Sequence, residues 1–368
     1  MTKIIDIVKR VYSGGTPDTR KNDYWNGNIK WLSSGETRNN FVYDTDKKIT
    51  ELGVTNSSTK LALKGSIVMA CAGQGVTRGQ TSYLMDNMYI NQSVICIEPD
   101  ENKVDGLYLY YFFKNNYQLL RTLSDDHSSR GSITTAMIKE FEVDFPDISV
   151  QKRISSLLYS LDQKIELNNK INNNLYEEAV ALYKDKFKGI EQGEKTIGEY
   201  MLPKRGKNLL TRDAVEGEIP VVAGGLEPSA YHNQSNTKSP VITISASGAN
   251  AGYTNLWNIP VWASDCSYID ESITKNVYFW YIVLKTRQNE IFDAQTGSAQ
   301  PHIYPQHIAE MPIDVLNDYE VEKYNTLVEP LFKMIGNNKT ENIKLSQLRD
   351  TLLPKLMNGE IDLDNIEI

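Results

Sequence analysis

Side chains that commonly bind metals or act as catalytic nucleophiles are few in this sequence and stand far apart. Its histidines, none of which has the spacing of a metal-binding pair, are His127, His232, His302 and His307. Prolines at positions 301 and 305 exclude a shared helical face for the last two. Its cysteines, which form no C-x-x-C pair, are Cys71, Cys96 and Cys266. The sequence therefore predicts no catalytic residue, no metal site and no disulfide framework.

Two glycine-rich segments could be compared with phosphate-binding loops, but neither has the required spacing. Residues 73–79 read G-Q-G-V-T-R-G, which departs from G-x-G-x-x-G, and we interpret them as a turn after a strand. In residues 189–196, Glu194 separates Gly193 from Lys195, and its carboxylate would repel a phosphate. We interpret this segment as a linker. An adenine methyltransferase would also need an Asp/Asn-Pro-Pro-Tyr/Phe motif, which the sequence lacks.

The elements that position any functional side chain belong to a chain of 368 residues, a length typical of two or three domains. Its 39 Lys and Arg against 47 Asp and Glu give a formal charge of −8, which taken alone argues against a nucleic-acid partner. No apolar run is long enough to span a membrane, and the first residues lack the apolar stretch of a signal peptide. We therefore expect a cytoplasmic protein.

Two long segments, residues 150–188 and 319–357, share one helical pattern at a constant offset. Their seam positions alternate in steps of four and three, as in a coiled coil. In the first segment these positions are Ile154, Leu158, Leu161, Ile165, Asn168, Asn172, Leu175, Ala179, Leu182 and Lys186. In the second they are Tyr324, Val328, Leu331, Ile335, Asn338, Asn342, Leu345, Arg349, Leu352 and Leu356. Every pair differs by 170 in number, so the chain contains an internal repeat that ends each time in a long helix.

Asparagines interrupt the apolar seam at equivalent steps of the two segments: Asn168, Asn172, Asn338 and Asn342. A polar residue on a seam lowers stability but fixes the register, because its amide must find a partner. If the helices run antiparallel, the four amides meet near the middle; alternatively, the asparagines mark a solvated stretch. Pro354 is expected to kink or end the last turns of the second helix.

The segments in front of the two helices repeat as well. Residues 27–35 parallel 217–225, the β-type run 66–70 parallels 240–244, and the helical stretch 107–113 parallels 277–283. The predicted fold class is α+β, with two tandem pseudo-symmetric mixed α/β domains joined by two long antiparallel coiled-coil helices. The predicted parts are a first domain at 1–149, a spacer helix at 150–190, a second domain at 191–317, a spacer helix at 318–358 and a tail at 359–368. Such pseudo-two-fold symmetry suits a two-fold partner, for example DNA or a pair of identical subunits.

Several motifs add a family resemblance to this tandem. In the second domain the stretches are 240–252 (PVITISASGANAG), 260–266 (PVWASDC) and 297–302 (GSAQPH). In the first they are 13–17 (SGGTP), Tyr24 with Trp25, Trp31, and Asn91 with Gln92. The helices contribute QKRI at 151–154 and LRDTLLPKL at 348–356. Over essentially its whole length, the chain resembles the specificity subunit of type I restriction–modification enzymes.

That resemblance implies two target-recognition domains, each reading half of an asymmetric, bipartite DNA site, with the helices setting the spacing between the halves. It implies as partners double-stranded DNA, two methyltransferase subunits, and restriction and translocase subunits. S-adenosylmethionine, ATP and Mg²⁺ are then expected in those subunits and no cofactor in this chain. The chain itself would be a non-catalytic subunit in a bacterial or archaeal cytoplasm.

The distribution of charge explains how an acidic chain could contact DNA. Residues 1–146 are neutral overall and residues 191–316 carry −5, yet residues 1–21 carry +3 and residues 195–212 carry +4. Both basic segments open a domain, and phosphates are contacted by lysine and arginine. The predicted phosphate contacts are Lys9, Arg10, Arg20, Lys21, Lys204, Arg205, Lys207 and Arg212. For each of them the alternative is a solvated basic turn.

Base edges are read mainly by amide, hydroxyl and guanidinium groups, so polar loop positions are the candidates for base reading. In the first domain they are Tyr24, Arg38, Gln74, Thr77, Arg78, His127, Ser128, Ser129 and Arg130. In the second they are Tyr231, His232, Ser245, Ser247, Asn250, Gln295, Ser298, Gln300 and His302. Arg130 could pair with guanine, and Asn250 or Gln300 with adenine. Expected in cores instead are Trp31, Trp262, Trp280, Tyr108, Tyr110 and Tyr111.

Two other functions compete with DNA recognition. One is a scaffold whose coiled coil recruits proteins without DNA contact, which predicts no sequence-dependent retention on duplex DNA. The other is a stand-alone methyltransferase or nuclease, which predicts methyl transfer or cleavage by this chain alone.

Overall fold

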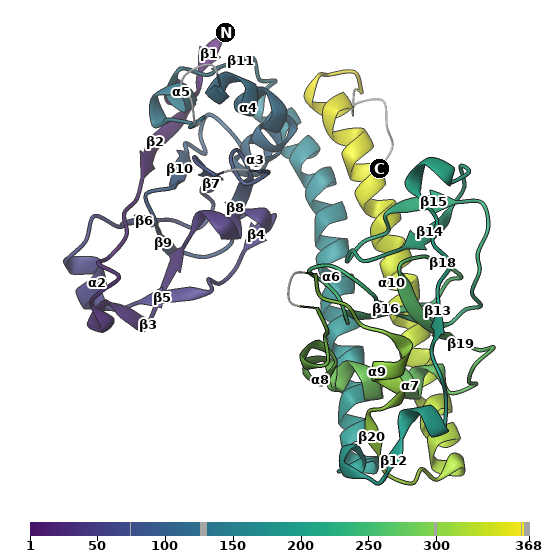
Figure 1. Cartoon of the computed structure of the whole chain (residues 1–368). Helices are drawn as coiled ribbons and strands as arrows, with labels where there is room; N and C mark the ends of the chain where they lie inside the picture. The colour runs from purple at the N-terminus through teal and green to yellow at the C-terminus, as the bar shows by residue number, and fades with distance from the viewer. Residues whose placement is uncertain (74, 126–130, 298–299, 362, 364–368) are drawn as a thin grey trace. The chain divides into compact units, whose positions relative to one another are not determined.

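The computed structural model of the chain describes residues 1–73, 75–125, 131–297, 300–361 and 363. Its contacts divide the chain into two compact units: unit 1 comprises Met1–Lys164 with Leu345–Ile368, and unit 2 comprises Ile165–Lys344. Each unit contains one mixed α/β domain and a stretch of both long helices (Figure 1). No helix in the described part of the chain is long and apolar enough to cross a membrane. The domain boundaries predicted from the repeat stay predictions.

The strands of unit 1 form a five-stranded sheet in the order β2-β10-β7-β8-β4, a four-stranded sheet in the order β5-β3-β9-β6, and the pair β1-β11. They are β1 (Thr2–Lys3), β2 (Val8–Ser13), β3 (Trp25–Leu32), β4 (Phe41–Val42), β5 (Lys47–Ile49), β6 (Lys60–Ala62), β7 (Ile67–Ala70), β8 (Thr81–Leu84), β9 (Met88–Ile90), β10 (Val94–Pro99) and β11 (Glu142–Val143). β7 and β10 are buried along their whole length, as the apolar runs at residues 67–70 and 94–97 require, and the carboxylate of Glu98 near the end of β10 is paired with Arg10.

The helices of unit 1 are α1 (Ile4–Ile7), α2 (Glu51–Thr55), α3 (Gly106–Asn115), α4 (Tyr117–Asp125) and α5 (Thr135–Glu140). Asp105 caps α3 by accepting from the Tyr108 amide at 2.8 Å. Tyr108, Tyr110 and Tyr111 of this helix are buried in the same core as β7 and β10, so the prediction that these tyrosines pack in a core is confirmed.

Unit 2 repeats this plan with a four-stranded sheet in the order β13-β19-β16-β17, a three-stranded sheet in the order β15-β14-β18, and the pair β12-β20. Its strands are β12 (Lys195–Thr196), β13 (Lys204–Arg205), β14 (Ile219–Val222), β15 (Ala230–His232), β16 (Val241–Ser245), β17 (Thr254–Trp257), β18 (Trp262–Ala263), β19 (Cys266–Asp270) and β20 (Pro312–Ile313). Its helices are α7 (Val277–Thr286), α8 (Gln288–Asp293) and α9 (Pro305–Ala309). The α+β tandem is therefore confirmed.

The long helices are α6 (Ile148–Lys186) and α10 (Asp318–Met357), and α10 continues past Pro354 to Met357. They run antiparallel, because bonds join rising numbers on α6 to falling numbers on α10. Asn168 Nδ2 donates to Asn342 Oδ1, and Asn338 Nδ2 donates to Asn172 Oδ1, both at 2.8 Å. The four amides thus meet as two pairs inside unit 2.

Candidate nucleic-acid interface

In unit 2, the loop between β16 and β17 is held against the segment that precedes α9. Gly252 takes a left-handed conformation (φ +84°), and its amide donates to the Ser245 carbonyl at 2.7 Å. The Ile303 amide donates to the Ala246 carbonyl at 2.9 Å, which ties the loop to residues 300–304. Polar side chains on these two segments therefore share one end of the sheet.

Several predicted contact residues meet around Asp265 at this end. Ser247 Oγ donates to Asp265 Oδ2, and Arg205 Nη2 donates to Asp265 Oδ1 at 2.5 Å. His302 is joined to Ser247 by an antiparallel β-bridge. Asp265 thus links a predicted phosphate contact, Arg205, to a predicted base reader, Ser247, and the backbone of a second reader, His302, lies beside Ser247. The sequence pattern did not single out Asp265, although it stands inside the 260–266 motif.

The other accessible candidates of unit 2 surround this group or lie on the second sheet. Asn250 Nδ2 donates to a carbonyl of the loop after β14 at 3.3 Å, and Gln295 Nε2 donates to a carbonyl of the β16–β17 loop at 2.8 Å. Gln300 is exposed beside the same loop, and Tyr231 is half exposed on β15. The side-chain amides of Asn250 and Gln295, which base reading would need, are therefore used in hydrogen bonds that hold the loop in place.

Two predicted base readers of unit 2 are corrected by their burial. His232 is 7% exposed; its Nδ1 accepts from the Val215 amide at 3.0 Å, and its ring packs edge-on against Trp262 at 5.1 Å. Ser245 is 4% exposed, and its Oγ donates to the Gly224 carbonyl at 3.2 Å. Both side chains hold their own domain together and present almost no surface to a ligand.

Unit 1 has the equivalent loop between β7 and β8, residues 71–78, which is two residues longer than the loop of unit 2. The Gly79 amide (φ +85°) donates back to the end of β7 at 2.9 Å, and the Ile133 amide donates to the start of the loop at 2.9 Å. Tyr117 and Arg121 of α4 donate to carbonyls of the loop at 2.6 and 2.5 Å. The same frame thus holds a different loop in each unit.

Two predicted base readers of unit 1 are also corrected. Arg78 is 5% exposed, and its Nη2 donates to Asp125 Oδ1 at 2.5 Å. Its guanidinium lies so close to Gly131 that a Cβ there would be 1.4 Å from Nη1. Tyr24 is buried, and its hydroxyl accepts from Lys21 Nζ at 3.1 Å. Arg78 therefore closes the base of the loop, and Tyr24 belongs to the interior.

Of the remaining candidates in unit 1, Arg38 is exposed and Thr77 is half-buried on the loop. The predicted readers that lie outside the described residues are Gln74, His127, Ser128, Ser129, Arg130 and, in unit 2, Ser298. Their assignment stays a prediction.

A hollow of about 490 Å³ lies beside the basic start of unit 1 and is lined in part by Trp25, Lys47 and Lys48. Lys47 Nζ stands 5.9 Å from the Trp25 ring centroid. The neighbouring Arg20 makes two bonds of 3.0 Å to the Asp18 carboxylate. The two lysines enlarge this basic group, and the sequence pattern missed them because they come from β5, distant along the chain.

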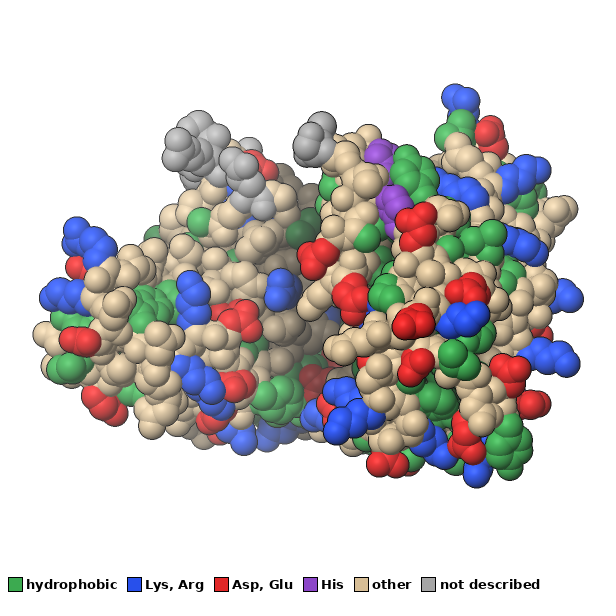
Figure 2. All heavy atoms as spheres, turned by 60° about the horizontal axis from the view of Figure 1, so that its bottom comes forward, with side chains coloured by type: hydrophobic (Ala, Val, Ile, Leu, Met, Phe, Trp, Pro, Cys, Tyr) green, Lys and Arg blue, Asp and Glu red, His purple; other side chains and the backbone are tan. Residues whose placement is uncertain are grey.

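All the predicted phosphate contacts are exposed, but all four arginines among them are already paired. Their acidic neighbours are Glu98 for Arg10, Asp18 for Arg20, Asp265 for Arg205 and Asp213 for Arg212. Lys9 and Lys207 make no ion pair with a described residue. On the face shown in Figure 2, basic and acidic side chains are interleaved and form no continuous basic surface.

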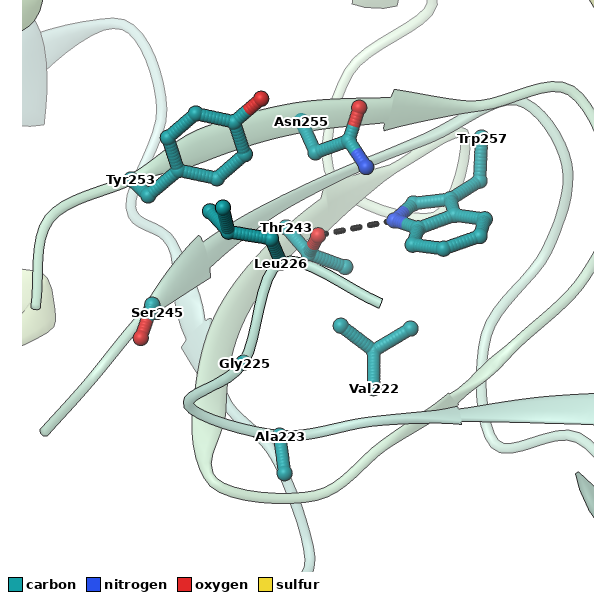
Figure 3. Close-up of a pocket in the computed structure, with 9 residues that line it drawn as sticks. All are labelled: Val222, Ala223, Gly225, Leu226, Thr243, Ser245, Tyr253, Asn255 and Trp257. Carbon is teal, nitrogen blue, oxygen red and sulfur yellow. Dashed lines mark hydrogen bonds between the residues drawn. The ribbon is translucent and has the colours of Figure 1, made fainter. Parts of the chain in front are cut away.

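A shallow hollow in unit 2 shows further polar groups on the exposed face of the sheet (Figure 3). Asn255 and Trp257 of β17 and Tyr253, which directly precedes that strand, line it together at alternate positions, as the period of an extended chain requires. Trp257 Nε1 donates to Thr243 Oγ1 at 2.9 Å, and Leu226 covers the hollow while remaining half exposed. Tyr253 and Asn255 are additional candidate contacts that period-two alternation could have indicated.

The described residues contain no cluster of three or more His, Cys, Asp or Glu side chains placed to hold a metal ion. Burial raises the pKa of Cys96 to about 11 and that of Cys266 to about 12, so both remain thiols at neutral pH. The polar groups gathered at the loops are hydrogen-bond donors and acceptors suited to binding.

The chain is similar in sequence and in fold to known proteins. Residues 1–177 match the family described as the type I restriction modification DNA specificity domain. The chain is 26% identical over 410 residues to the type I restriction enzyme MjaIX specificity subunit of Methanocaldococcus jannaschii, which covers 99% of this chain and 94% of that relative. It is 29% identical over 179 residues to the EcoR124I/EcoR124II specificity subunit of Escherichia coli, covering 48% and 43%. Its fold is similar to the crystal structure of a type I restriction–modification S subunit from M. genitalium, with a TM-score of 0.64 and 19% identity over 96% of this chain and 95% of that one.

Proposed function

We propose that this chain, which is similar to the specificity subunits of type I restriction–modification systems, is itself such a non-catalytic subunit that recognises DNA sequence, and that its two α/β domains read the two halves of a bipartite, asymmetric DNA site. The observation that carries this proposal is that the same backbone hydrogen bond holds a loop at the equivalent place in each unit, although the two loops have different sequences. Gly79 and Gly252 close equivalent loops with the same backbone bond, yet the loops differ in length and in their side chains. Equivalent frames with different readers fit two unlike half-sites.

The second part of the proposal is that α6 and α10 bind two methyltransferase subunits, which restriction subunits then join. Apolar side chains on the outer faces of these helices support it, since each is about half exposed: Leu167, Leu327, Met334, Ile343 and Leu348. Exposed apolar side chains that form a contiguous patch mark protein-binding surfaces, and the proposal expects these side chains to do so. S-adenosylmethionine, ATP and Mg²⁺ would then act in those partner subunits.

The chain alone should hold DNA weakly. Its charge of −8 repels the phosphate backbone, and four of its predicted phosphate contacts share their charge with a carboxylate. Affinity would then come largely from basic surface that the methyltransferase subunits add around the duplex. Strong, salt-resistant specific binding by the isolated chain would contradict this part of the proposal.

The main experiment is to co-express the chain with its methyltransferase and map methylated adenines by long-read sequencing. The expected result is one bipartite, asymmetric site. Exchanging residues 191–316 for those of another specificity subunit should change only one half of that site, and a change in both halves would contradict the assignment of one domain to each half. Methylation that loses all sequence dependence would favour the scaffold, and methyl transfer by this chain alone would favour the enzyme.

A second experiment tests whether the helices set the spacing of the half-sites. Deleting residues 165–171 and 339–345 removes one heptad from matched positions and shortens the pair by about 10 Å, since an α-helix rises about 1.5 Å per residue. The spacing should fall by about three base pairs, at roughly 3.4 Å each, or methylation should cease. The full-length variant N168A/N342A loses the same asparagine pair and should keep the original spacing. Continued methylation at that spacing by the shortened chain would refute the role of the helices.

A further inference from the structure

A buried ionic network joins α3, α6 and α10 inside unit 1. Tyr111 Oη donates to Asp162 Oδ2 at 2.7 Å, and Arg349 Nη1 donates to Asp162 Oδ1 at 2.5 Å. The Asp162 side chain is 2% exposed and that of Arg349 is 11% exposed. Charges this deeply buried are tolerated because each satisfies the other. Removing Arg349 leaves the Asp162 carboxylate without a cation, whereas removing Asp162 leaves Arg349 with only the exposed carboxylate of Asp350.

The equivalent positions of unit 2 contain no charge. With the offset of 170, Tyr111 corresponds to Tyr281 and Asp162 to Phe332, while Arg349 corresponds to Ala179. These three residues are buried in one apolar cluster, and the Tyr281 and Phe332 rings pack edge to face at 5.5 Å. One site of the repeat is therefore ionic in unit 1 and apolar in unit 2.

The asparagine pairs of the same helices behave differently. The offset converts the pair Asn168–Asn342 into the pair Asn338–Asn172, so the two pairs are copies of one another. Asparagine pairs of this kind specify the register of the helices. The same amide pairs could form between two copies of α6 or two copies of α10, and so the pairs by themselves do not tell the two helices apart. Asn168 also donates to Glu341 at 2.7 Å, and Asn342 to Asn169 at 2.9 Å, but these added bonds lie toward the surface.

We propose that the network of Tyr111, Asp162 and Arg349 makes the two halves of the chain pair with each other and prevents like halves of two copies from pairing. Here the N-terminal half is residues 1–188, which end in α6, and the C-terminal half is residues 189–368, which end in α10. In a pair of N-terminal halves, Ala179 of the second copy would take the place of Arg349, and the Asp162 carboxylate would be buried without a cation. In a pair of C-terminal halves, the Arg349 guanidinium of the second copy would be buried against Phe332 and would keep the exposed carboxylate of its neighbour Asp350 but lose the buried one of Asp162.

The consequence goes beyond the proposed DNA-reading function and does not depend on it. A tandem repeat whose halves are alike can exchange halves between copies, because each helix offers its partner the same seam. The ionic site costs desolvation but penalises both wrong pairings, which is a known use of buried polar groups. The chain thereby keeps two unlike domains in one molecule.

The test uses the full chain with a protease site inserted between Lys188 and Gly189. Both residues are exposed, and nothing lies within 4 Å of where a Gly189 side chain would begin. Isotopically light and heavy chains are cut, unfolded together and refolded, and native mass spectrometry counts the three kinds of paired halves. Random pairing would make half of all complexes like pairs. Like pairs should instead be at least about tenfold rarer, given the cost of an unpaired buried charge.

Two double variants make the units alike and should restore random pairing. A179R/F332D places the ionic residues beside Tyr281 in unit 2, and D162F/R349A gives unit 1 the apolar set. Combining all four substitutions makes the halves unlike again and should restore discrimination. The control N168A/N338A removes two asparagine pairs from every kind of pairing and, besides these, only the bond of Asn168 to Glu341 from the native one, so it should leave the ratio nearly unchanged.

Like pairs at their random share in the unsubstituted cut chain would overturn the proposal, as would discrimination that persists in a refolded double variant. If neither double variant refolds, the ratio in the unsubstituted chain decides alone. Because no DNA is present, failure here is distinguishable from failure of the proposed DNA-reading function.

Discussion

Replacing Lys204, Arg205 and Lys207 with alanine should weaken DNA binding on all sequences alike and flatten its dependence on salt. Each phosphate contact releases counterions and adds about 0.9 to the slope of log K against log salt. All three side chains are exposed, so each can reach a phosphate. Arg205 shares its charge with Asp265, at 2.5 Å, and should contribute less than the two lysines. The slope should therefore fall by about 2 to 3.

The assay is fluorescence anisotropy with the chain in complex with its methyltransferase, at 50 to 200 mM salt. Over that range the affinity lost by the unsubstituted complex should exceed that lost by the variant by roughly 10- to 40-fold, which follows from two or three missing contacts. The loss should be the same on the methylated target sequence and on an unrelated duplex, because phosphates carry no sequence information.

Lys195 supplies the matched control. It lies in the same basic segment and is also exposed, but its Nζ pairs with Glu199 at 2.5 Å and it is not among the predicted contacts. K195A should leave the slope unchanged. A slope that stays constant in the triple variant, or one that falls as much in K195A, would refute the assignment of phosphate contacts to residues 204–207.

Three further predictions concern unit 1. Arg349→Met should lower the free energy of unfolding in urea by about 3–5 kcal/mol, because Asp162 stays buried without a cation. The control Asp350→Asn removes an exposed carboxylate from the same guanidinium and should cost less than about 1 kcal/mol. Burial, and then Arg349, lower the pKa of Lys114 from 10.5 to about 8, so the unfolded state binds the proton more tightly. The stability of the unsubstituted chain should therefore rise relative to Lys114→Met between pH about 8 and 10.5, and a constant difference would contradict this. Gly131→Ala should lower the free energy of unfolding in urea by at least about 1–2 kcal/mol, the cost of alanine in a left-handed conformation, since the φ of residue 131 is +59° and a Cβ there would meet the buried Arg78 guanidinium.

The sequence predicts well the parts of the fold that depend on local periodicity. The seams of α6 and α10 follow from steps of four and three, and their equivalence follows from one constant offset. The core helices α3 and α7 likewise follow from unbroken apolar and aromatic runs. Antiparallel pairing makes these patterns meet, and the asparagine amides meet with them.

The candidate interface was harder to predict, because polarity in a loop does not report the direction of a side chain. Arg78 and Ser245 are both polar and next to glycine-rich turns, yet both point inward to partners far along the chain. Arg78 pairs with Asp125, which a reading of neighbouring residues cannot find. Asp265 and Lys47 were missed for the converse reason, since sheet pairing alone brings them to the predicted contacts.

A repeat predicts equivalence, but the departures from equivalence are what a reader of two unlike half-sites needs. The frame around Gly79 and Gly252 is the same in both units, so it fixes where a loop stands without deciding what it contacts. Under the proposed function, base choice would depend on the loops themselves, which differ in length and side chains. The same reasoning applies to the helices, where symmetric asparagine pairs fix the register and the asymmetric Asp162–Arg349 pair distinguishes the partners. A mutation at Gly79 should therefore impair its unit in the same way as a mutation at Gly252 impairs the other. Mutations at positions that differ between the units should instead change which DNA sequence is recognised or which half of the chain is bound.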